Sequence, residues 1–270
     1  MCGIMSQDLQ NQTPNIKISL DEVGVTDFKT QISITRGTKV YRYTATVSVV
    51  INLPSDQKGA HLSRFVETIS EVLSSEIETH YSLEEMSIHV LKMLNDRHDF
   101  IKASISLDFL FFTTRLTPVT KKSSKEYYKG KLITWWDNKK IEHELSLGTF
   151  GNTACPHALS RNSSQRTHIQ RAYAEISLRG KTKDIPDMED LSIVIDQSFS
   201  SPTFSLLKSE DEQWVVEKMH ENPLFVEDVT RNLLELASKH YSKKNLKIKA
   251  QTISQESIHK HNVVSRGSIP

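Results

Sequence analysis

The sequence predicts an α+β fold, in which antiparallel strands form sheets and paired helices cover one face of each sheet. Three observations predict this fold: segments with strand-like alternation, amphipathic segments of helical period that come in pairs, and an order of elements that occurs once in each half of the chain. That order is strand, strand, helix, helix, strand, with a further strand expected at the end. Two such halves in tandem would leave exposed sheet edges, so we expect edge-to-edge assembly into a larger ring or barrel.

The elements of the first half follow a polar segment, residues 1–15, which we expect to be disordered or loosely ordered. Period-two alternation of β-branched and aromatic residues predicts the strands, and apolar residues on one helical face predict the first helix. Ser82 and Glu85 form a capping box, which predicts the start of the second helix. The expected elements are strand 40–53, turn 54–59, helix 61–78, helix 82–95 and strand 103–116.

The elements of the second half follow a basic segment, VTKKSSKEYYKGK (119–131), which we interpret as a solvated loop that could also hold a phosphate. The same criteria of period and turn residues apply to the rest of the chain. The expected elements are strand 131–149 with a turn at 137–139, strand 171–178, helix 187–199, helical region 208–241 with a break at 222–223, and strand 246–254. We therefore expect three parts: the N-terminal segment 1–15, a first module 16–130 and a second module 131–270.

Composition excludes several classes of protein. The chain holds 34 Lys+Arg against 33 Asp+Glu, and it therefore lacks the basic excess of a duplex-binding protein. No run of about eighteen apolar residues predicts a membrane span, and no basic segment followed by an apolar core predicts a secretory signal. The two cysteines, Cys2 and Cys155, cannot form a disulfide framework. We therefore expect a cytoplasmic protein with no nucleic-acid or membrane partner.

The stretch TACPHALSRNSSQRTHIQRA (153–172) carries the first candidate for chemistry. Cys155, His157 and His168 offer thiolate and imidazole groups, which zinc and other first-row metals favour as ligands. Structural zinc sites usually have paired ligand clusters, and the sequence has no second cysteine pair. From these residues alone, two interpretations stay open: a metal site, or a structural thiol with surface histidines.

The C-terminal part adds carboxylates and further imidazoles. Glu227 lies beside an apolar run, and Glu256, His259 and His261 follow the last predicted strand. A catalytic metal keeps about three protein ligands and one open position, with a carboxylate to move protons. The chain has no G-x-S-x-G elbow, P-loop or G-x-G-x-x-G motif, so any phosphates must be held by Arg or Lys side chains or by helix N-termini.

Seven segments, in one order and spanning nearly the whole chain, resemble the GTP cyclohydrolases of the type IB and archaeal MptA group. The segments are ISLDEVGVTD (18–27), LPSDQKGAHLSRFVE (53–67), TACPHA (153–158), THIQRA (167–172), LLKSEDE (206–212), ENPLFVEDVTR (221–231) and QESIHKH (255–261). The resemblance implies a tunnelling fold of two β-β-α-α-β-β modules and a homodimer or homotetramer with sites at subunit interfaces. It also implies hydrolytic opening of the guanine imidazole ring of GTP, with release of C8 as formate.

The resemblance also implies roles for single residues. Cys155, His168 and His259 match the family's metal ligands. Glu212 and Glu227 match carboxylates that act either as a metal ligand or as a proton shuttle. The resemblance therefore implies three catalytic residues: Cys155, Glu212 and Glu227. Glu256 matches the carboxylate that anchors guanine, which suits a group able to accept from both N1–H and the 2-amino group. The phosphate contacts that it implies are His61, Arg64 and Arg171.

Three positions depart from the family's motifs. His157 stands where the family has a second cysteine, and Ile169 stands where the family's motif has an asparagine. Leu159 stands where bacterial members commonly have a lysine. Phosphate or ribose contacts made by those residues are therefore in question. His157 is either an additional metal ligand or an exposed loop residue.

The two branches of the group differ in product. The archaeal branch uses ferrous iron and gives 7,8-dihydroneopterin 2′,3′-cyclic phosphate, whereas the bacterial branch gives 7,8-dihydroneopterin triphosphate for folate. Segments 18–27 and 53–56 and Thr167 resemble the archaeal branch, whereas AHLSRFVE (60–67) resembles the bacterial branch. We favour the archaeal branch, and therefore expect its product and Fe(II), with Mn or Zn as other candidates. Two alternatives are a tunnelling-fold protein that binds a purine or pterin without catalysis, and an enzyme of this fold that acts on a pterin.

Overall fold

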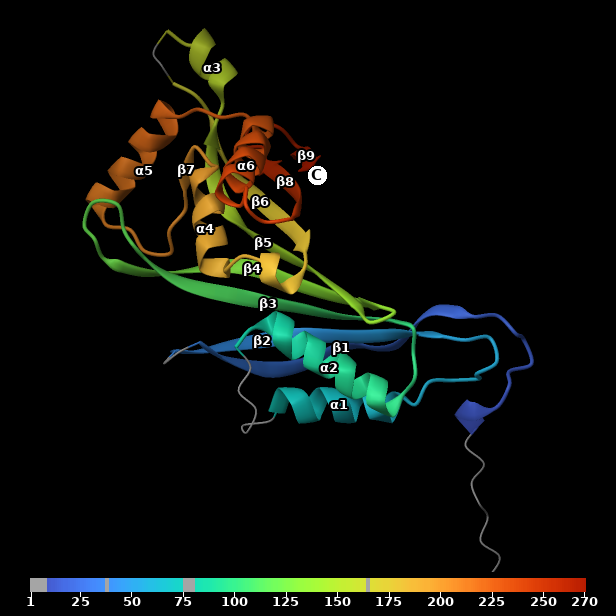
Figure 1. The fold of residues 1–270 in the computed structure, drawn as a ribbon. Helices are drawn as coiled ribbons and strands as arrows, with labels where there is room; N and C mark the ends of the chain where they lie inside the picture. The colour runs from blue at the N-terminus through green and yellow to red at the C-terminus, as the bar shows by residue number, and fades with distance from the viewer. Residues whose placement is uncertain (1–8, 37–38, 75–80, 164–165) are drawn as a thin grey trace, which may run out of the picture. The chain divides into compact units, whose positions relative to one another are not determined.

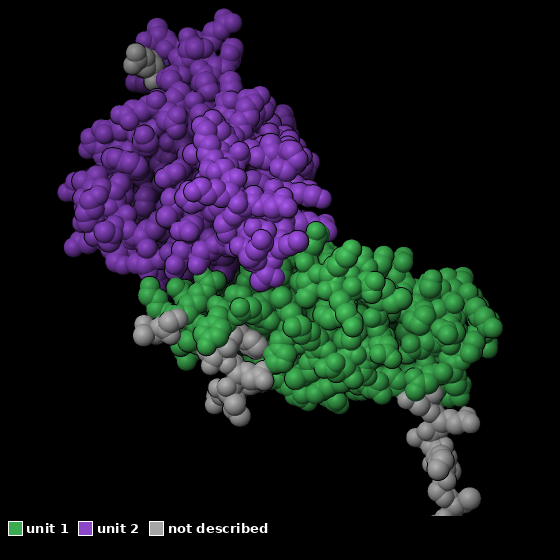
Figure 2. All heavy atoms as spheres, in the orientation of Figure 1, with its two compact units in different colours: residues 1–109, 132–143 green, residues 110–131, 144–270 purple. Residues whose placement is uncertain are grey.

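The computed structural model of the 270-residue chain describes residues 9–36, 39–74, 81–163 and 166–270. The chain divides into two compact units, which Figure 2 shows in different colours. Unit 1 comprises residues 1–109 and 132–143, and unit 2 comprises residues 110–131 and 144–270. The boundary expected at residues 130 and 131 falls inside a strand that contributes to both units.

The described elements follow the predicted order closely. The strands are β1 (Leu20–Arg36), β2 (Lys39–Leu53), β3 (Lys102–Leu116), β4 (Ser123–Asp137), β5 (Lys140–Ala154), β6 (Ile169–Gly180), β7 (Ser201–Pro202), β8 (Lys247–Gln255) and β9 (Val263–Ile269). The α-helices are α1 (Leu62–Ser74), α2 (Leu83–Arg97), α3 (Pro156–Arg161), α4 (Met188–Gln197), α5 (Ser209–Glu221) and α6 (Val226–His240). The hydrogen-bonded strand order is β1-β2-β3-β4-β5-β6-β8-β9, and β7 pairs with β5.

Unit 1 is an antiparallel sheet with two helices packed beside each other (Figure 1). β2 pairs with both β1 and β3, so that Val49 lies opposite Val25 on one side and Ile105 on the other. Alternate residues of β2 are buried, and the apolar face of α1, including Phe65 and Ile69, is buried as well. The predicted cap of α2 is confirmed, because the Ser82 hydroxyl accepts from the Glu85 N–H at 3.1 Å.

Unit 2 is built on the same plan. β8 pairs antiparallel with β6 and β9, α6 packs on all three strands, and α4 packs on α6 and β6 (Figure 1). The inward side chains of β6 are fully buried against the helices: Ala172, Ala174, Ile176 and Leu178. The observed sheets and helix pairs confirm the α+β fold class. The break expected at 222–223 separates α5 from α6, and a final strand, β9, follows as expected.

The prediction of a loop over residues 119–131 was wrong, because β4 begins at Ser123. The first two inward residues of β4, Ser124 and Glu126, are polar, so the start of the strand shows no apolar alternation. Glu126 is buried and its carboxylate accepts hydrogen bonds from the Ser205 N–H and hydroxyl, at 3.1 and 3.0 Å, and from the Ser124 hydroxyl at 2.5 Å. A buried carboxylate satisfied in this way replaces the apolar contact that the alternation criterion looks for.

Two further predictions concern element ends. The turn expected at 137–139 is confirmed, since Asn138 and Lys139 have φ values of 47° and 67° between β4 and β5, as a two-residue hairpin turn requires. The first helix was expected to reach residue 78, and α1 ends at Ser74; residues 75–78 lie outside the described part of the chain. Within the described residues, no helix has the length and apolar character needed to cross a membrane.

His143, at the unit 1 end of β5, should make the protein sensitive to acid. Its ring is fully buried, its Nδ1 lies 2.8 Å from the Thr134 hydroxyl, and burial lowers its pKa to about 4. Because the unfolded chain binds a proton more readily than the folded chain between pH 6.5 and 4, stability falls with pH in that window, by up to about 3 kcal/mol. Urea unfolding of wild type and His143→Gln at pH 7 and pH 4.5 measures this effect, and an equal loss of stability in both proteins would contradict it.

Candidate functional site

Cys155 lies directly after β5, at the N-cap of the short helix α3. Its Sγ is 3.4 Å from the Ala158 N–H, and its own N–H donates to the His168 carbonyl at 3.2 Å. Its side chain is partly buried and forms no disulfide. The backbone hydrogen bond to His168 therefore joins the end of β5 to the start of β6 at the two predicted metal ligands.

His168 directly precedes β6, and the residue before it strengthens the same junction. The Thr167 hydroxyl donates to the Cys155 carbonyl at 2.6 Å. The Nδ1 of His168 lies 3.5 Å from the Ser257 hydroxyl, which belongs to the segment after β8. Three strand ends, those of β5, β6 and β8, thus meet at this point of unit 2.

Glu256 is held at the same place by a residue that we did not single out from the sequence. The Gln170 amide donates to the Glu256 carboxylate at 3.2 Å, and both side chains are partly buried. The next residue, Arg171, pairs in register with Gln255 across β6 and β8. The signal for Gln170 was its position in THIQRA, two residues after a candidate ligand.

Helix α5, which carries Glu212, packs beside this junction. Val215 and Met219 form a buried apolar cluster with Ala154, the residue before Cys155, and Ile169, the residue after His168, packs against it. Because Glu212 lies three residues before Val215, it is on the same side of the helix as that cluster. Its side chain is exposed.

The N-terminus of α5 is fixed by Asp211, which is fully buried. One carboxylate oxygen accepts from the Val119 and Thr120 N–H groups at 2.8 and 2.9 Å, and the other accepts from the Thr120 hydroxyl and the Lys208 N–H at 2.5 and 3.1 Å. Burial alone would raise the pKa of Asp211, but these four hydrogen bonds together hold it well below its usual range. Asp211 thereby ties α5 to the turn between β3 and β4.

The other predicted carboxylate and imidazole are less constrained. Glu227 lies in the first turn of α6 and is exposed. His259 is exposed between β8 and β9, and its ring stacks on that of His261 at 5.2 Å between centroids. Among the described residues, no three or more His, Cys, Asp or Glu side chains are gathered closely enough to hold a metal ion. Cys155 and His168 are brought together through their backbones, while His259, Glu212 and Glu227 stay predictions.

The predicted phosphate contacts fall in different units. His61 and Arg64 belong to unit 1, where they line a polar hollow of about 460 Å³ together with His98. The His61 Nε2 lies 3.1 Å from the Asn11 amide oxygen, and Arg64 donates to the Arg97 carbonyl at 2.6 Å. Arg171 is in unit 2, exposed, with its guanidinium 4.4 Å from the centroid of the Phe150 ring.

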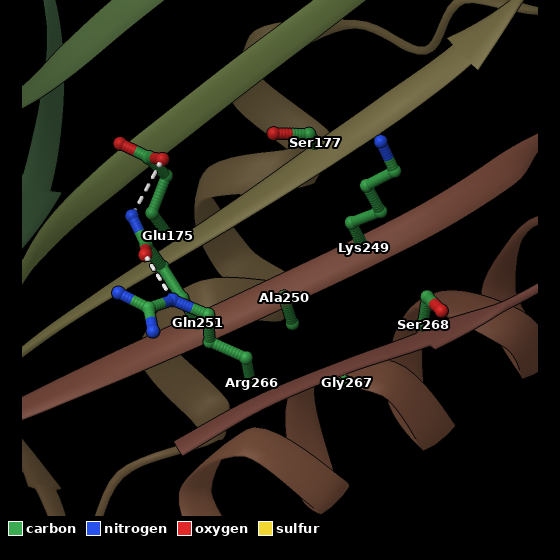
Figure 3. A pocket seen from close by; sticks show the side chains of 8 residues that line it. All are labelled: Glu175, Ser177, Lys249, Ala250, Gln251, Arg266, Gly267 and Ser268. Atoms are coloured by element: carbon green, nitrogen blue, oxygen red, sulfur yellow. Dashed lines mark hydrogen bonds between the residues drawn. The ribbon is translucent and has the colours of Figure 1, made fainter. Parts of the chain in front are cut away.

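A hollow of unit 2 lies on the strands β6, β8 and β9 and measures about 510 Å³ (Figure 3). Gln251 donates to the Glu175 carboxylate at 3.1 Å, and its amide oxygen lies 3.4 Å from the Arg266 Nε, so these three side chains form one row across the strands. Glu175 and Arg266 are thus each bonded to the Gln251 amide, and the hollow contains none of the predicted site residues.

Comparison with known proteins gives the chain its family. A family model described as "Type I GTP cyclohydrolase folE2" matches residues 6–265. The chain belongs to this family. Among its relatives, the "GTP cyclohydrolase MptA" of Pyrococcus abyssi is 38% identical, covering 97% of this chain and 98% of the relative. The MptA protein of Pyrococcus furiosus is 37% identical with the same coverage. "GTP cyclohydrolase FolE2" of Fervidobacterium nodosum is 33% identical, covering 96% and 95%.

Solved structures support the fold. The uricase of Arthrobacter globiformis superposes with a TM-score of 0.59 over 92% of this chain and 93% of the uricase, at 9% identity. A thermostable mutant of that enzyme gives 0.61 over 93% and 91%, at 7% identity. At such low identity the likeness concerns the fold alone, and it confirms the predicted tunnelling fold.

The structure shows the surroundings of the three residues that depart from the family's motifs. Ile169 packs against the apolar cluster that seats α5, so a hydrophobic side chain has a structural use at the position of the motif's asparagine. His157 lies on α3 and is exposed. Leu159, on the same short helix, is partly buried, and its N–H donates to the Cys155 carbonyl at 3.2 Å.

Proposed function

We propose that the chain is a metal-dependent GTP cyclohydrolase that adds water at C8 of the guanine ring and releases this carbon as formate. The observation that carries the proposal is the meeting of Cys155, His168 and Glu256 at one junction of three strand ends. A thiol and an imidazole beside a carboxylate provide metal ligands next to a group that can recognise a purine edge. Family membership supports the same reaction class.

The donor set suits a first-row divalent metal, since a thiolate and imidazoles are ligands that Fe(II) and Zn accept. We propose Cys155, His168 and His259 as its ligands, Fe(II) as the native ion, and Mn or Zn as substitutes. Such an ion lowers the pKa of a bound water and so supplies a nucleophile at neutral pH. Glu212 and Glu227 are the candidates for taking the proton from that water, and each is exposed on a helix of unit 2.

Glu256 would accept hydrogen bonds from the N1–H and 2-amino groups of guanine. Gln170 donates to one oxygen of this carboxylate, which fixes its orientation; because each carboxylate oxygen can accept two hydrogen bonds, both oxygens can still accept from the base. Arg171 in unit 2 is a candidate phosphate contact, and His61 and Arg64 in unit 1 are, independently, candidates for the same role. We further propose a cytoplasmic homodimer or homotetramer with sites at subunit interfaces, because the fold leaves the edge strand β9 available for assembly.

We propose 7,8-dihydroneopterin 2′,3′-cyclic phosphate as the product, on the way to a methanopterin-type cofactor. The support is that relatives at 37 and 38% identity carry the name MptA. A relative at 33% identity carries the name FolE2. The alternative product is therefore 7,8-dihydroneopterin triphosphate. The test is anaerobic incubation of the purified protein with Fe(II) and GTP, followed by measurement of formate and by mass analysis of the pterin.

In that test, formate and pterin should appear in equal amounts, and the pterin mass should show loss of pyrophosphate. A pterin that retains three phosphates would instead select the triphosphate product. Absence of formate with Fe(II), Mn(II) and Zn(II) alike would contradict the proposed reaction.

Exchanging the guanine anchor should separate binding from chemistry. The Glu256→Gln side chain has only one oxygen that can accept hydrogen bonds, so we expect KM for GTP to rise about tenfold or more. Inosine triphosphate lacks the 2-amino group, so the variant should also prefer GTP over inosine triphosphate less strongly than wild type does. Steady-state formate release with both nucleotides measures this. If the preference for GTP over inosine triphosphate is unchanged in the variant, Glu256 does not read the guanine edge.

A further inference from the structure

The strands of unit 2 present one face to α4 and α6 and the other face away from these helices. On β4, the Tyr128 hydroxyl donates to Asp196 of α4 at 2.6 Å, so the next side chain back, Tyr127, lies on the opposite face. On β9, a side chain at Gly267 would lie 2.8 Å from an atom of α6, so its neighbour Arg266 lies on the opposite face as well. We call this face of β3, β4, β5, β6, β8 and β9, which points away from α4 and α6, the far face.

A row of aromatic and aliphatic side chains crosses the far face. Phe112 on β3 and Tyr127 on β4 have ring centroids 6.4 Å apart, and Phe150 on β5 and Tyr173 on β6 have centroids 5.3 Å apart. The row continues in register on β8 and β9 with Ile253 and Val264. Phe112 is 52% exposed and Tyr127 is 44% exposed, so two neighbouring rings offer apolar surface to a flat partner.

The far face is also basic. Its strand positions in unit 2 carry two carboxylates, Glu144 and Glu175, against eight cations. The cations are Lys125, Lys129, Lys131, Arg171, Arg179, Lys247, Lys249 and Arg266. Figure 3 shows two of them, Lys249 and Arg266, on β8 and β9. The helices on the other face, α4 and α6, carry six carboxylates against two Lys or Arg. The near-neutral charge of the whole chain therefore averages over two faces of opposite charge.

These two properties limit the chemistry of a partner. A second copy that presented the same face would meet charge of the same sign, which disfavours such a contact. A polyanion suits the cations, and Lys129 places its Nζ 5.6 Å from the centroid of the Tyr173 ring, so charge and aromatic surface lie side by side. Exposed rings on neighbouring strands of an antiparallel sheet, beside Lys and Arg, are the arrangement by which RNA-recognition motifs stack unpaired bases.

We propose that the far face of unit 2 binds single-stranded nucleic acid. The bases stack on Phe112 and Tyr127, and the phosphates follow the lysines of β4 and β8. We expected no nucleic-acid partner from the charge of the whole chain, but that argument does not apply to a face whose charge differs from the average. The binding needs neither Cys155 nor a metal, and it is therefore independent of the proposed reaction.

The test is fluorescence anisotropy of a labelled oligouridylate of about 20 nucleotides, titrated with the full chain without GTP or added metal. Tyr127→Leu removes a stacking ring and keeps an apolar side chain, and we expect it to weaken binding about fivefold or more. The double variant Lys129→Gln with Lys249→Gln removes two phosphate contacts. We expect it to reduce the slope of log affinity against log salt by about 1.4, since each contact to a single strand contributes about 0.7.

Matched controls lie away from the far face. Tyr81→Leu removes a ring of unit 1 that is 64% exposed. Lys239→Gln with Lys243→Gln removes two exposed cations, one at the end of α6 and one in the turn after it. We expect each control to keep its affinity within about twofold of wild type.

Each remaining outcome would overturn the proposal. Absence of oligouridylate binding at low salt would do so directly, and equal losses in the controls and the far-face variants would indicate diffuse charge attraction. Equal affinity for a duplex of the same length would exclude base stacking. Tighter binding to phosphatidylserine vesicles, lost in the same far-face variants, would assign the face to an anionic membrane. If Tyr127→Leu fails to fold by circular dichroism, Phe112→Leu replaces it and the lysine variant is read in the same way.

Discussion

Cys155→Ala is expected to lower GTP turnover by at least about a thousandfold. Under the proposed function, loss of this thiolate would remove a metal whose Lewis-acid contribution is several kcal/mol, and each 1.4 kcal/mol is a factor of ten in rate. His168→Ala should have an effect of similar size, because the two residues are joined at one junction and would bind the same ion. Formate release and bound metal per chain are the two measurements, and they should fall together.

His157→Ala is the matched control for that experiment. His157 is the imidazole nearest to Cys155 in sequence, but it is exposed on α3, and its carbonyl accepts a hydrogen bond from the Ser160 hydroxyl. We expect its replacement to leave turnover and metal content within about twofold of wild type. Full activity in Cys155→Ala, or loss of the metal in His157→Ala but not in His168→Ala, would contradict the assignment of ligands.

Asp211→Ala is expected to lower the melting temperature on the order of 5 to 10 °C and to reduce turnover as well. The substitution leaves the N–H groups of Val119, Thr120 and Lys208 without the acceptor that they share. Because Glu212 is the next residue, loosening of the α5 N-terminus also displaces a candidate proton acceptor. Thermal unfolding and steady-state kinetics measure the two effects.

Asp228→Ala is the matched control, because it removes an aspartate from the corresponding position of another helix. Asp228 occupies the same place in α6 as Asp211 in α5, and its carboxylate accepts from the Phe225 N–H at 3.1 Å. Unlike Asp211, however, its side chain is one third exposed, and its other partner is the exposed Arg231. We expect a much smaller change in melting temperature. Similar changes in both variants would mean that Asp211 acts as an ordinary helix cap and not as a link between α5 and the turn after β3.

The pH dependence of Asp211 has a definite sign. Its pKa is held below the ordinary value in the folded protein, so its contribution to stability is present at neutral pH and is lost as pH falls below the ordinary range of an aspartate. The loss that His143 causes occurs at higher pH, between 6.5 and 4. Acid unfolding of the wild type should therefore show destabilisation beginning near pH 6, and His143→Gln should delay it.

Local patterns of the sequence were sufficient for most of the fold. The alternation in residues 40–53 predicted β2, and the capping box at Ser82 predicted the start of α2, because both signals depend on neighbours within a few positions. The first part of β4 was missed for the opposite reason. Its inward residue Glu126 is satisfied by Ser205, 79 positions later, and no local pattern encodes that contact.

The candidate site could be predicted only in part. Sequence motifs selected Cys155, His168 and Glu256, and the structure brings these residues to one junction. Asp211 was not selected, because its importance lies in a contact that spans about 90 positions, the hydrogen bond from the Thr120 N–H. Such pairs become visible only when the strand order is known.

The central claim is that Cys155 and His168 bind one divalent metal, and cobalt substitution tests it most directly. Titration of the metal-free protein with Co(II) under anaerobic conditions should produce a thiolate-to-cobalt charge-transfer absorption that saturates at one ion per chain. Cys155→Ser should abolish this absorption, and His157→Ala should retain it. A wild-type protein that binds Co(II) without the charge-transfer absorption, or that keeps it in Cys155→Ser, would contradict the account.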